Sequence, residues 1–165
     1  MIRLYVIYLA DDDPKKCTAK KLERFSMVKL IKRKNFSGGI VLSPLADDVI
    51  SKDDYIEAVQ KGLYAVDGSW KHIEEIFSNI KGNFRRLPFL IPGNPVNFGH
   101  PGMLSTAEAL AAALYIMGED NQALKIMGKF SWGHTFIETN IELLKSYKNA
   151  NKEKIIEIEK EFQQF

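Results

Sequence analysis

The chain has 165 residues and a mass of 18.8 kDa, and its 45% hydrophobic and 27% charged residues exclude disorder over most of its length. The net charge of +2 is too small to identify a partner, and the single cysteine, Cys17, excludes an internal disulfide framework and a multi-cysteine metal cluster. No apolar run approaches the roughly 20 residues that span a bilayer, and the N-terminus lacks a signal-peptide pattern, so we expect a cytoplasmic protein without membrane contact.

Strand and helix patterns alternate through the first half of the chain. In chain order, they predict a strand at 2–9, a basic helix at 18–27, strands at 28–31 and 40–42, a helix at 51–61, a strand at 63–66, a helix at 70–80 and a last strand at 87–91. Ser51 and Asp54 have the spacing of a capping box, and Gly62 follows the end of the helix that they open. Strands that alternate with helices predict a parallel sheet.

The second half has the pattern of a helical domain. Ser105, with Glu108 three residues later, predicts a capped, alanine-rich helix that reaches Met117. Further helices are predicted at 120–127, 134–148 and 151–163. The expected fold class is therefore α/β, with a parallel sheet in an N-terminal domain, residues 1–92, and an all-helical C-terminal domain, residues 93–165.

Basic residues are concentrated near the N-terminus. Nine Lys and Arg residues lie between Lys15 and Lys34, against a single acid, Glu23. On a chain with little net charge, such a cluster favours local binding of phosphate groups. A solvated charged face would have the same composition, so the pattern leaves both interpretations open.

Three turns at 42–44, 66–70 and 90–102 follow predicted strands. Ligands collect at the carboxyl ends of the strands in an open parallel sheet, so we expect these turns to form a crevice with apolar walls. Exposed backbone groups there would suit a nucleoside. The sequence has no GxGxxG or phosphate-loop pattern, which disfavours ordinary dinucleotide and nucleoside triphosphate sites.

Several residues of these turns could carry chemistry. Asp67 ends an apolar strand, where it could act as a base, although it could equally cap the next helix. Trp70 could stack on a base or face a sulfonium cation, but a core tryptophan at a helix start has the same pattern. The amides of Ser105 and Thr106 mark a helix N-terminus, which is a suitable site for a carboxylate.

Six collinear segments, spread over nearly the whole chain, resemble one known family. They are 13–22 (DPKKCTAKKL), 65–70 (AVDGSW), 86–88 (RLP), 94–99 (NPVNFG), 104–113 (LSTAEALAAA) and 132–136 (WGHTF). Together they resemble the small-subunit rRNA aminocarboxypropyltransferases of archaea and eukaryotes, which act in ribosome biogenesis. The short chain is more similar to the archaeal members.

The resemblance implies a fold and a reaction. The fold would be related to the knotted methyltransferases of the SPOUT class, completed by a helical C-terminal half. S-adenosylmethionine would be the cofactor, and small-subunit rRNA in a pre-ribosomal particle would be the partner. The N3 atom of an N1-methylpseudouridine would receive the 3-amino-3-carboxypropyl (acp) group, and 5′-methylthioadenosine would leave.

The resemblance also implies site residues. Cofactor contacts would come from Thr18, Val66, Leu87, Gly102 and Thr106, with apolar walls from Leu42, Pro44 and Trp70. Asp67 matches the acidic position of the family beside the cofactor and is the candidate catalytic residue. The candidate RNA contacts are Lys15, Lys16, Lys20, Lys21, Arg24, Lys32, Arg33, Arg85 and Arg86. The family usually has a cysteine where this chain has Gly68 and a bulky residue where it has Gly102. A backbone contact would survive at Gly102, but side-chain shielding of the adenine would be lost.

Two rival functions fit the same residues. A methyltransferase of the SPOUT type would release S-adenosylhomocysteine, and a non-catalytic assembly factor would bind pre-rRNA through its basic surface alone. SPOUT enzymes are usually dimers, but the helical half could cover the dimer surface, so we expect a monomer. A related N-terminal segment in ribosome-recycling ATPases is associated with iron–sulfur binding, but one cysteine cannot hold a cluster, so we expect no metal.

Overall fold

The computed structural model describes residues 1–8, 18–98 and 103–163 of the chain. Within these ranges the strands are β1 (Leu4–Tyr8), β2 (Lys29–Ile31), β3 (Ile40–Leu42), β4 (Leu63–Asp67) and β5 (Asn83–Arg85). The α-helices are α1 (Thr18–Arg24), α2 (Tyr55–Lys61), α3 (Trp70–Asn79), α4 (Thr106–Ile116), α5 (Asp120–Met127), α6 (Gly133–Tyr147) and α7 (Lys152–Gln163). Short 3-10 helices at Arg33–Asn35 and Lys52–Asp54 precede β3 and α2.

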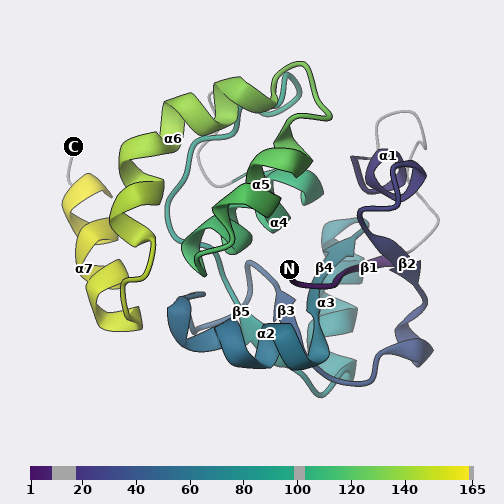
Figure 1. Ribbon diagram of the computed structural model, residues 1–165. Helices are drawn as coiled ribbons and strands as arrows, with labels where there is room; N and C mark the ends of the chain where they lie inside the picture. The colour runs from purple at the N-terminus through teal and green to yellow at the C-terminus, as the bar shows by residue number, and fades with distance from the viewer. Residues whose placement is uncertain (9–17, 99–102, 164–165) are drawn as a thin grey trace.

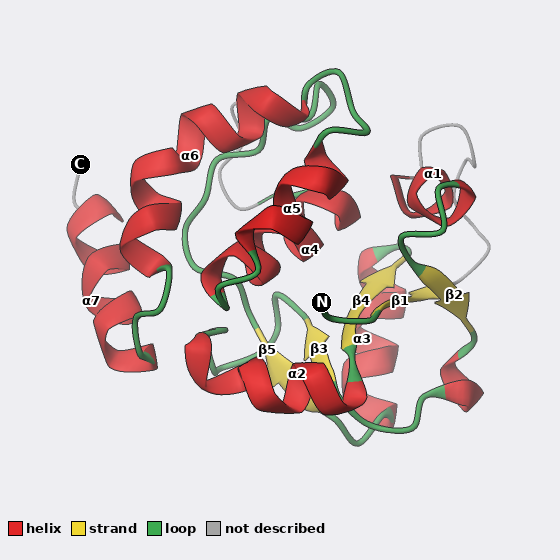
Figure 2. Cartoon of the chain, in the orientation of Figure 1, coloured by secondary structure: helices red, strands yellow, loops and turns green. Residues whose placement is uncertain are grey.

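The strands form one sheet in the order β2-β1-β4-β3-β5, and every pair is parallel (Figures 1 and 2). This confirms the predicted parallel sheet and the α/β class. Tyr8 of β1 pairs in register with Asp67 of β4, so both lie at the carboxyl edge of the sheet. In an open parallel sheet, ligands collect at this edge.

The two faces of the sheet carry alternate residues of each strand. Leu4 and Val6 of β1 join the larger core with α1, α2, α4 and α5, whereas Ile7 joins a smaller core against α3. This separation is the expected consequence of the two-residue repeat of a strand. The larger core also contains Ile158 of α7, so residues from both predicted domains share it.

Local capping signals are confirmed. Ser51 and Asp54 form a capping box at the 3-10 helix before α2, and Gly62 ends α2 with a φ of 97°. Ser105 and Glu108 form the second capping box, at the start of α4. None of the helices in the described ranges is both long and apolar enough to cross a bilayer.

The predicted strand at 87–91 is wrong: the last strand is β5, and only Arg86 extends it, by an isolated bridge to Val49. Pro88 and Pro92 have no N–H to donate, which makes this stretch a poor sheet strand. Instead, its backbone bonds to side chains of the C-terminal helices. Every second residue takes part: Phe89 with Glu159 and Tyr147, Ile91 with Asn140, and Gly93 with Glu108.

We call residues 86–94 the ladder segment, since helix side chains replace the neighbouring strand of an ordinary ladder. Asn140 accepts from the Ile91 N–H at 2.8 Å and donates to the Ile91 carbonyl at 2.7 Å. The Tyr147 hydroxyl donates to the Phe89 carbonyl at 3.0 Å, and burial raises the pKa of this phenol. At Gly93 a Cβ atom would lie 2.7 Å from the backbone nitrogen of Phe136, so only glycine allows this close approach to α6.

Candidate functional site

A cavity of about 660 Å³ opens at the carboxyl edge of the sheet. Val66, Asp67 and Gly68 line it from the end of β4, and Thr18 lines it from the start of α1. The opposite contributions come from the second half of the chain: Asn94, Pro95, Val96, Asn97, Leu104, Ser105, Thr106, Phe130 and Trp132. Both halves of the chain therefore build the cavity, and its size lies in the range of small-molecule sites.

The structure brings six of the predicted site residues into this cavity. Thr18, Val66, Asp67 and Thr106 were predicted for the cofactor, and Lys21 and Arg24 for RNA. Leu42, Pro44 and Leu87 are not among its lining residues. Leu42 is buried at the end of β3, Pro44 is exposed in the loop after it, and Leu87 packs against the larger core. Trp70 begins α3, but its side chain lies outside what the structure describes, as do Gly102, Lys15 and Lys16.

Thr18 connects the two sides of the cavity. Its hydroxyl oxygen accepts a hydrogen bond from the backbone N–H of Ala107 at 3.1 Å, across 89 residues of sequence. The hydroxyl therefore satisfies one of the N–H groups that the first turn of α4 leaves without a helical partner. This contact fixes the start of α1 against the start of α4.

A buried carboxylate organises the loop between the ladder segment and α4. The Glu108 side chain accepts from the backbone N–H groups of Gly93 at 2.6 Å, Asn94 at 3.1 Å and Ser105 at 2.9 Å. It also accepts from the Asn94 amide group at 2.6 Å. Glu108 is fully buried, and all four of these partners are donors, so its two carboxyl oxygens have hydrogen-bond partners although water is excluded. One side chain thus holds both ends of the segment that lines the cavity.

One expectation at this helix start is wrong. We expected the amides of both Ser105 and Thr106 to be available to a ligand, but the Ser105 N–H already donates to Glu108. Thr106 lines the cavity and remains the candidate for a carboxylate.

Asp67 lies half-buried at the end of β4, in register with Tyr8. Gly68 follows with a φ of 150° and also lines the cavity. The turn therefore carries the carboxylate to the cavity wall and turns the chain away into α3, without a bulky side chain at the next position.

Sequence reasoning missed the aromatic pair at the turn between α5 and α6. The rings of Phe130 and Trp132 lie with centroids 4.8 Å apart, and both line the cavity. The available signal was two aromatic residues separated by one, in a turn of the helical half. The segment 132–136 contributed to the family resemblance but was not interpreted as part of a site.

The predicted RNA-binding cations fall into two groups. The Nζ atoms of Lys20 and Lys21 lie over the rings of Tyr8 and Phe130, at 4.5 Å and 5.0 Å from the ring centroids. Lys21 and the exposed Arg24 also line the cavity. Lys32 is also exposed. The guanidinium groups of the remaining three contact carboxylates: Arg33 with Glu75, Arg85 with Asp54, and Arg86 with Glu159.

Two of these ion pairs lie at the start of the ladder segment, one from Arg85 just before it and one from Arg86 within it. The Arg85 Nε atom lies 3.0 Å from Asp54, whose pKa burial raises although the Arg85 charge opposes this. Arg86 donates to both oxygens of Glu159, at 3.0 Å and 2.9 Å, in a bidentate pair.

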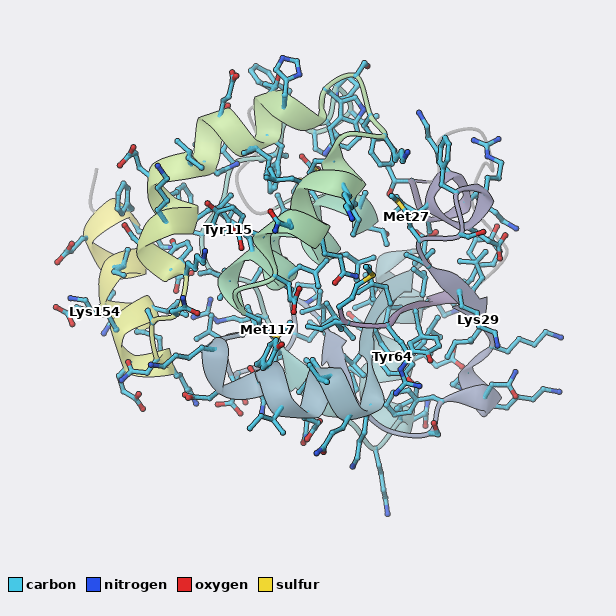
Figure 3. The ribbon with its side chains drawn as sticks, viewed as in Figure 1. Met27, Lys29, Tyr64, Tyr115, Met117 and Lys154 are labelled. Carbon is cyan, nitrogen blue, oxygen red and sulfur yellow. The ribbon has the colours of Figure 1, made fainter. Side chains whose placement is uncertain are left out.

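The molecule also has exposed charges far from the basic N-terminal region. Lys154 is exposed on α7, on the opposite side of the molecule from Lys29 of β2 (Figure 3). No group of three potential metal ligands occurs among the residues that the structure describes.

Comparison with known proteins adds three findings. A family model described as "Ribosome biogenesis protein, C-terminal" matches residues 40–163, and a model of a possible Fer4-like domain in RNase L inhibitor matches residues 2–35. Proteins named 16S rRNA aminocarboxypropyltransferase from Sulfurisphaera tokodaii, Methanosarcina mazei and Thermoplasma acidophilum are 43%, 41% and 44% identical to this chain. These matches cover 97%, 98% and 96% of this chain and 95%, 95% and 98% of the relatives.

A solved structure has the same fold. It is described as the SAM-dependent rRNA:acp-transferase Tsr3 from Vulcanisaeta distributa, and it is 37% identical with a TM-score of 0.87. The match covers 95% of this chain and 88% of that chain. The likeness therefore extends over both the sheet and the C-terminal helices.

Proposed function

The chain belongs to the 16S rRNA aminocarboxypropyltransferase family, and we propose that it transfers the acp group of S-adenosylmethionine to a nucleotide of small-subunit rRNA. The observation that carries this conclusion is identity of 41–44% to named relatives over nearly the full length of both chains. The same likeness makes the chain a transferase of ribosome biogenesis that uses S-adenosylmethionine.

The residues of the cavity suit this cofactor. A positively charged sulfonium and ammonium would be attracted to the Asp67 carboxylate, and the cofactor carboxylate would lie at the Thr106 amide, at the positive end of α4. The Thr18 hydroxyl would lie near the same amino-acid portion. Val66 and Leu87 would contribute backbone contacts, as would Gly102, and Leu42, Pro44 and Trp70 would supply apolar walls. When bound, S-adenosylmethionine supplies a carbon activated by the sulfonium, so that attack on it releases 5′-methylthioadenosine.

The acceptor that we propose is the N3 atom of an N1-methylpseudouridine. A bond forms between N3 and the γ-carbon of the methionine portion, the bond from that carbon to sulfur breaks, and N3 loses its proton. The task of the protein is to choose which carbon meets the incoming nitrogen, and correct placement supplies much of the rate. A pocket that buries the methyl group and presents the γ-carbon gives acp transfer, whereas the reverse orientation gives methylation.

The decisive experiment incubates the enzyme with rRNA from a strain that lacks the modification. S-adenosylmethionine carries label in either its carboxyl carbon or its methyl carbon. We expect rRNA to gain label from the carboxyl carbon only, with one equivalent of 5′-methylthioadenosine. Transfer of the methyl label, with release of S-adenosylhomocysteine, would establish the methyltransferase alternative, and failure of S-adenosylmethionine to bind would establish a non-catalytic assembly factor.

Asp67 is the catalytic residue that we propose, either as acceptor of the N3 proton or as partner of the positive charge on the cofactor. Asp67→Asn should lower turnover by about a hundredfold if it is the base. If its role is electrostatic, the affinity for S-adenosylmethionine should fall instead. Asp47→Asn, in an exposed loop, is the matched control and should change neither quantity. Unchanged turnover and affinity in Asp67→Asn would remove both roles.

The rRNA partner would bind along the basic N-terminal region. Of the predicted contacts, Lys21 and Arg24 line the cavity. Lys20 is half-exposed and Lys32 is exposed. Lys15 and Lys16 remain predicted contacts from the sequence, as do Arg33, Arg85 and Arg86, whose guanidinium groups also have carboxylate partners.

We also propose the topological knot of the SPOUT class. The strand order β2-β1-β4-β3-β5 supports it, together with the return of α4 from the β5 edge to pack on β4 and α1. Pulling a single molecule from both ends tests the knot. A knotted chain should remain shorter than the full contour of about 3.6 Å per residue, and an unknotted chain should reach it.

The remaining expectations are proposals of the same kind. We propose a cytoplasmic monomer with domains at 1–92 and 93–165, whose activity needs no metal. Sedimentation should give a single species of 18.8 kDa, and EDTA should leave the rate of acp transfer unchanged. The single cysteine of the chain supports the absence of an iron–sulfur cluster despite the Fer4-like match.

A further inference from the structure

The turn between α5 and α6 brings aromatic rings to the cavity that the cofactor assignments above do not use. Trp132 is half-buried: it packs against the larger core and also lines the cavity that contains Asp67. Its ring is tilted by 32° to that of Phe130, which supports it from the core side. An indole held in this way is a rigid stacking surface at the wall of the proposed active site.

Cations from the other half of the chain cover the neighbouring rings. The Lys21 Nζ atom lies 5.0 Å from the centroid of Phe130, and the Lys129 Nζ atom lies 4.7 Å from that of Phe25. Lys21 and Phe25 are one helical turn apart, and Phe25 is 49% exposed. These contacts place α1 and the α5–α6 turn side by side, and Met27, labelled in Figure 3, lines a groove with Ile126 of α5 just beyond them.

The combination of rings and cations indicates the chemistry of the ligand. Proteins bind single-stranded nucleic acid by stacking bases on aromatic side chains while basic groups follow the phosphates. The cations Lys21, Arg24 and Lys129 supply the second requirement, with one acid, Glu23, on the exposed part of α1. A base inside a duplex could not reach the cavity, because its target atom would be hidden in the stack.

We propose that α1 and the α5–α6 turn form a groove for single-stranded RNA, in which Trp132 stacks on the acceptor base. Lys21, Arg24 and Lys129 hold the flanking phosphates, and Phe25 provides an outer stacking surface for a neighbouring base. This inference rests on the proposed function, since it supplies the place of the acceptor beside Asp67. The RNA contacts predicted from the sequence all lie in the N-terminal half, between Lys15 and Arg86. The groove adds contacts from the C-terminal half.

The test uses a fluorescein-labelled single-stranded RNA of twelve nucleotides around the position that receives the carboxyl label. Trp132→Leu keeps an apolar side chain but removes the ring, and should weaken RNA binding by about tenfold or more, since one stacked base contributes that much. Trp132→Phe should stay within about threefold of the wild type. In steady-state transfer, Trp132→Leu should raise KM for RNA much more than it lowers kcat.

A second RNA, with an abasic site at the acceptor position, identifies the stacked base. If Trp132 stacks on the acceptor, the abasic RNA should bind the wild type and Trp132→Leu equally well. In a double-mutant cycle, removing one of two interacting groups abolishes the effect of removing the other. Leu124→Ala is the matched control, because Leu124 is an exposed apolar residue of α5 outside the groove, and it should change nothing. A full loss on both RNAs would show that the ring does not meet the acceptor base.

The affinity for S-adenosylmethionine separates this inference from the proposed function. It should be the same in the wild type and Trp132→Leu. A parallel loss of cofactor affinity would overturn the groove and make Trp132 part of the cofactor pocket. Unchanged RNA affinity and KM in Trp132→Leu would also overturn it, even in an enzyme that transfers acp. A wild type that binds cofactor and RNA but transfers no acp group would contradict the proposed function instead.

Discussion

Two walls of the cavity are built by different kinds of contact. The α4 wall, residues 93–98 and 103–108, is fixed by a fully buried carboxylate that accepts four hydrogen bonds. The α1 wall, formed by α1, Phe25 and the α5–α6 turn, has its cations over aromatic rings, and Phe25 is 49% exposed. Both walls line one space, but a buried polar network holds the first, whereas the cations of the second lie over aromatic rings.

The difference matches two kinds of ligand. Four hydrogen bonds to a buried carboxyl group, three of them from backbone N–H groups, fix backbone positions, because each unmade bond would leave a desolvated donor. A cation over an exposed ring contributes only about 0.5–1 kcal/mol, so a phosphate can replace it at little cost. The α4 wall is therefore suited to orient a small cofactor, and the α1 wall to receive a longer, charged and variable chain.

Replacing the buried carboxylate should have the largest effect. In Glu108→Gln an NH₂ group takes the place of one acceptor oxygen and faces N–H donors. We expect the free energy of unfolding to fall by about 3 kcal/mol, because buried donors lose their partners. The displaced wall should also bind S-adenosylmethionine more weakly. We expect the affinity, measured by calorimetry well below the melting temperature, to fall by about tenfold, which corresponds to about 1.4 kcal/mol of binding free energy.

Glu138→Gln is the matched control, because Glu138 is exposed on α6, and it should leave both quantities unchanged. A Glu108→Gln protein that loses stability but binds the cofactor with full affinity would show that the fixed wall does not orient the ligand.

The next largest effect should come from Arg86, at the start of the ladder segment, which leads to the α4 wall. Arg86→Met removes the guanidinium group from Glu159, a buried residue that also accepts from the Phe89 N–H at 2.7 Å. Breaking a fully buried pair costs about 3–5 kcal/mol, and the 28% exposure of the Arg86 side chain reduces this, so we expect a loss of about 2 kcal/mol. Denaturant titration measures it.

The same variant tests the RNA contact that the sequence predicts for Arg86. If its role is structural, the folded Arg86→Met protein should bind RNA as the wild type does. A loss of RNA affinity without a loss of stability would instead place Arg86 on the RNA and remove it from the support of the α4 wall.

The capping boxes and most elements follow from the sequence because their causes are local. Ser105 and Glu108 are three residues apart, so their reciprocal bonds are visible in the letters. The ladder segment has no such local cause: Phe89 and Ile91 bond to side chains 70 and 49 residues away. Residues 87–91 have the apolar content of a strand, and periodicity does not tell which groups accept the N–H bonds.

The residues of the site also differ in whether the sequence could predict them. Thr18, Val66, Asp67 and Thr106 were predicted from turns at strand and helix ends and from the family resemblance, and the topology of a parallel sheet brings such ends together. Trp132 was missed because its meaning depends on α1, which lies more than a hundred residues earlier and contacts its neighbour Phe130 through Lys21. The second role of Glu108, as acceptor from Gly93 and Asn94, was hidden by its familiar role in the cap.

Separating the two walls at a hydrogen bond that joins them directly should have a smaller effect. Thr18→Val keeps the shape of the side chain but removes the oxygen that accepts from the Ala107 N–H. We expect a loss of about 1 kcal/mol in unfolding free energy and a severalfold loss of cofactor affinity. Thr18→Ser retains the hydroxyl and should restore most of both. Equal behaviour of the valine and serine variants would mean that packing, and not this bond, positions α1.

A single cation of the α1 wall should matter least for the cofactor and be visible mainly in salt. Arg24→Gln should weaken binding of single-stranded RNA and reduce the slope of log K against log salt by about 0.7, because one phosphate contact is lost. Its unfolding free energy and cofactor affinity should stay unchanged, since Arg24 is exposed. Glu23→Gln, the neighbouring exposed control, should strengthen RNA binding slightly.

The smallest expected effect concerns pH and lies where the ladder segment begins. Burial raises the pKa of Asp54 above its ordinary value of 3.8, although Arg85 opposes the shift. The folded state therefore holds this proton more firmly than the unfolded state. The contribution of Asp54 to stability is complete below pH 3.8 and is lost as the pH rises through the higher folded pKa. Asp54→Asn should remove this slope from the unfolding free energy while cofactor affinity, measured over the same range, keeps its own pH dependence. If the substitution also changed the pH dependence of cofactor affinity, the contacts that fix the α4 wall would include the ladder segment and the end of β5. The two walls would then differ in extent as well as in the kind of contact that holds them.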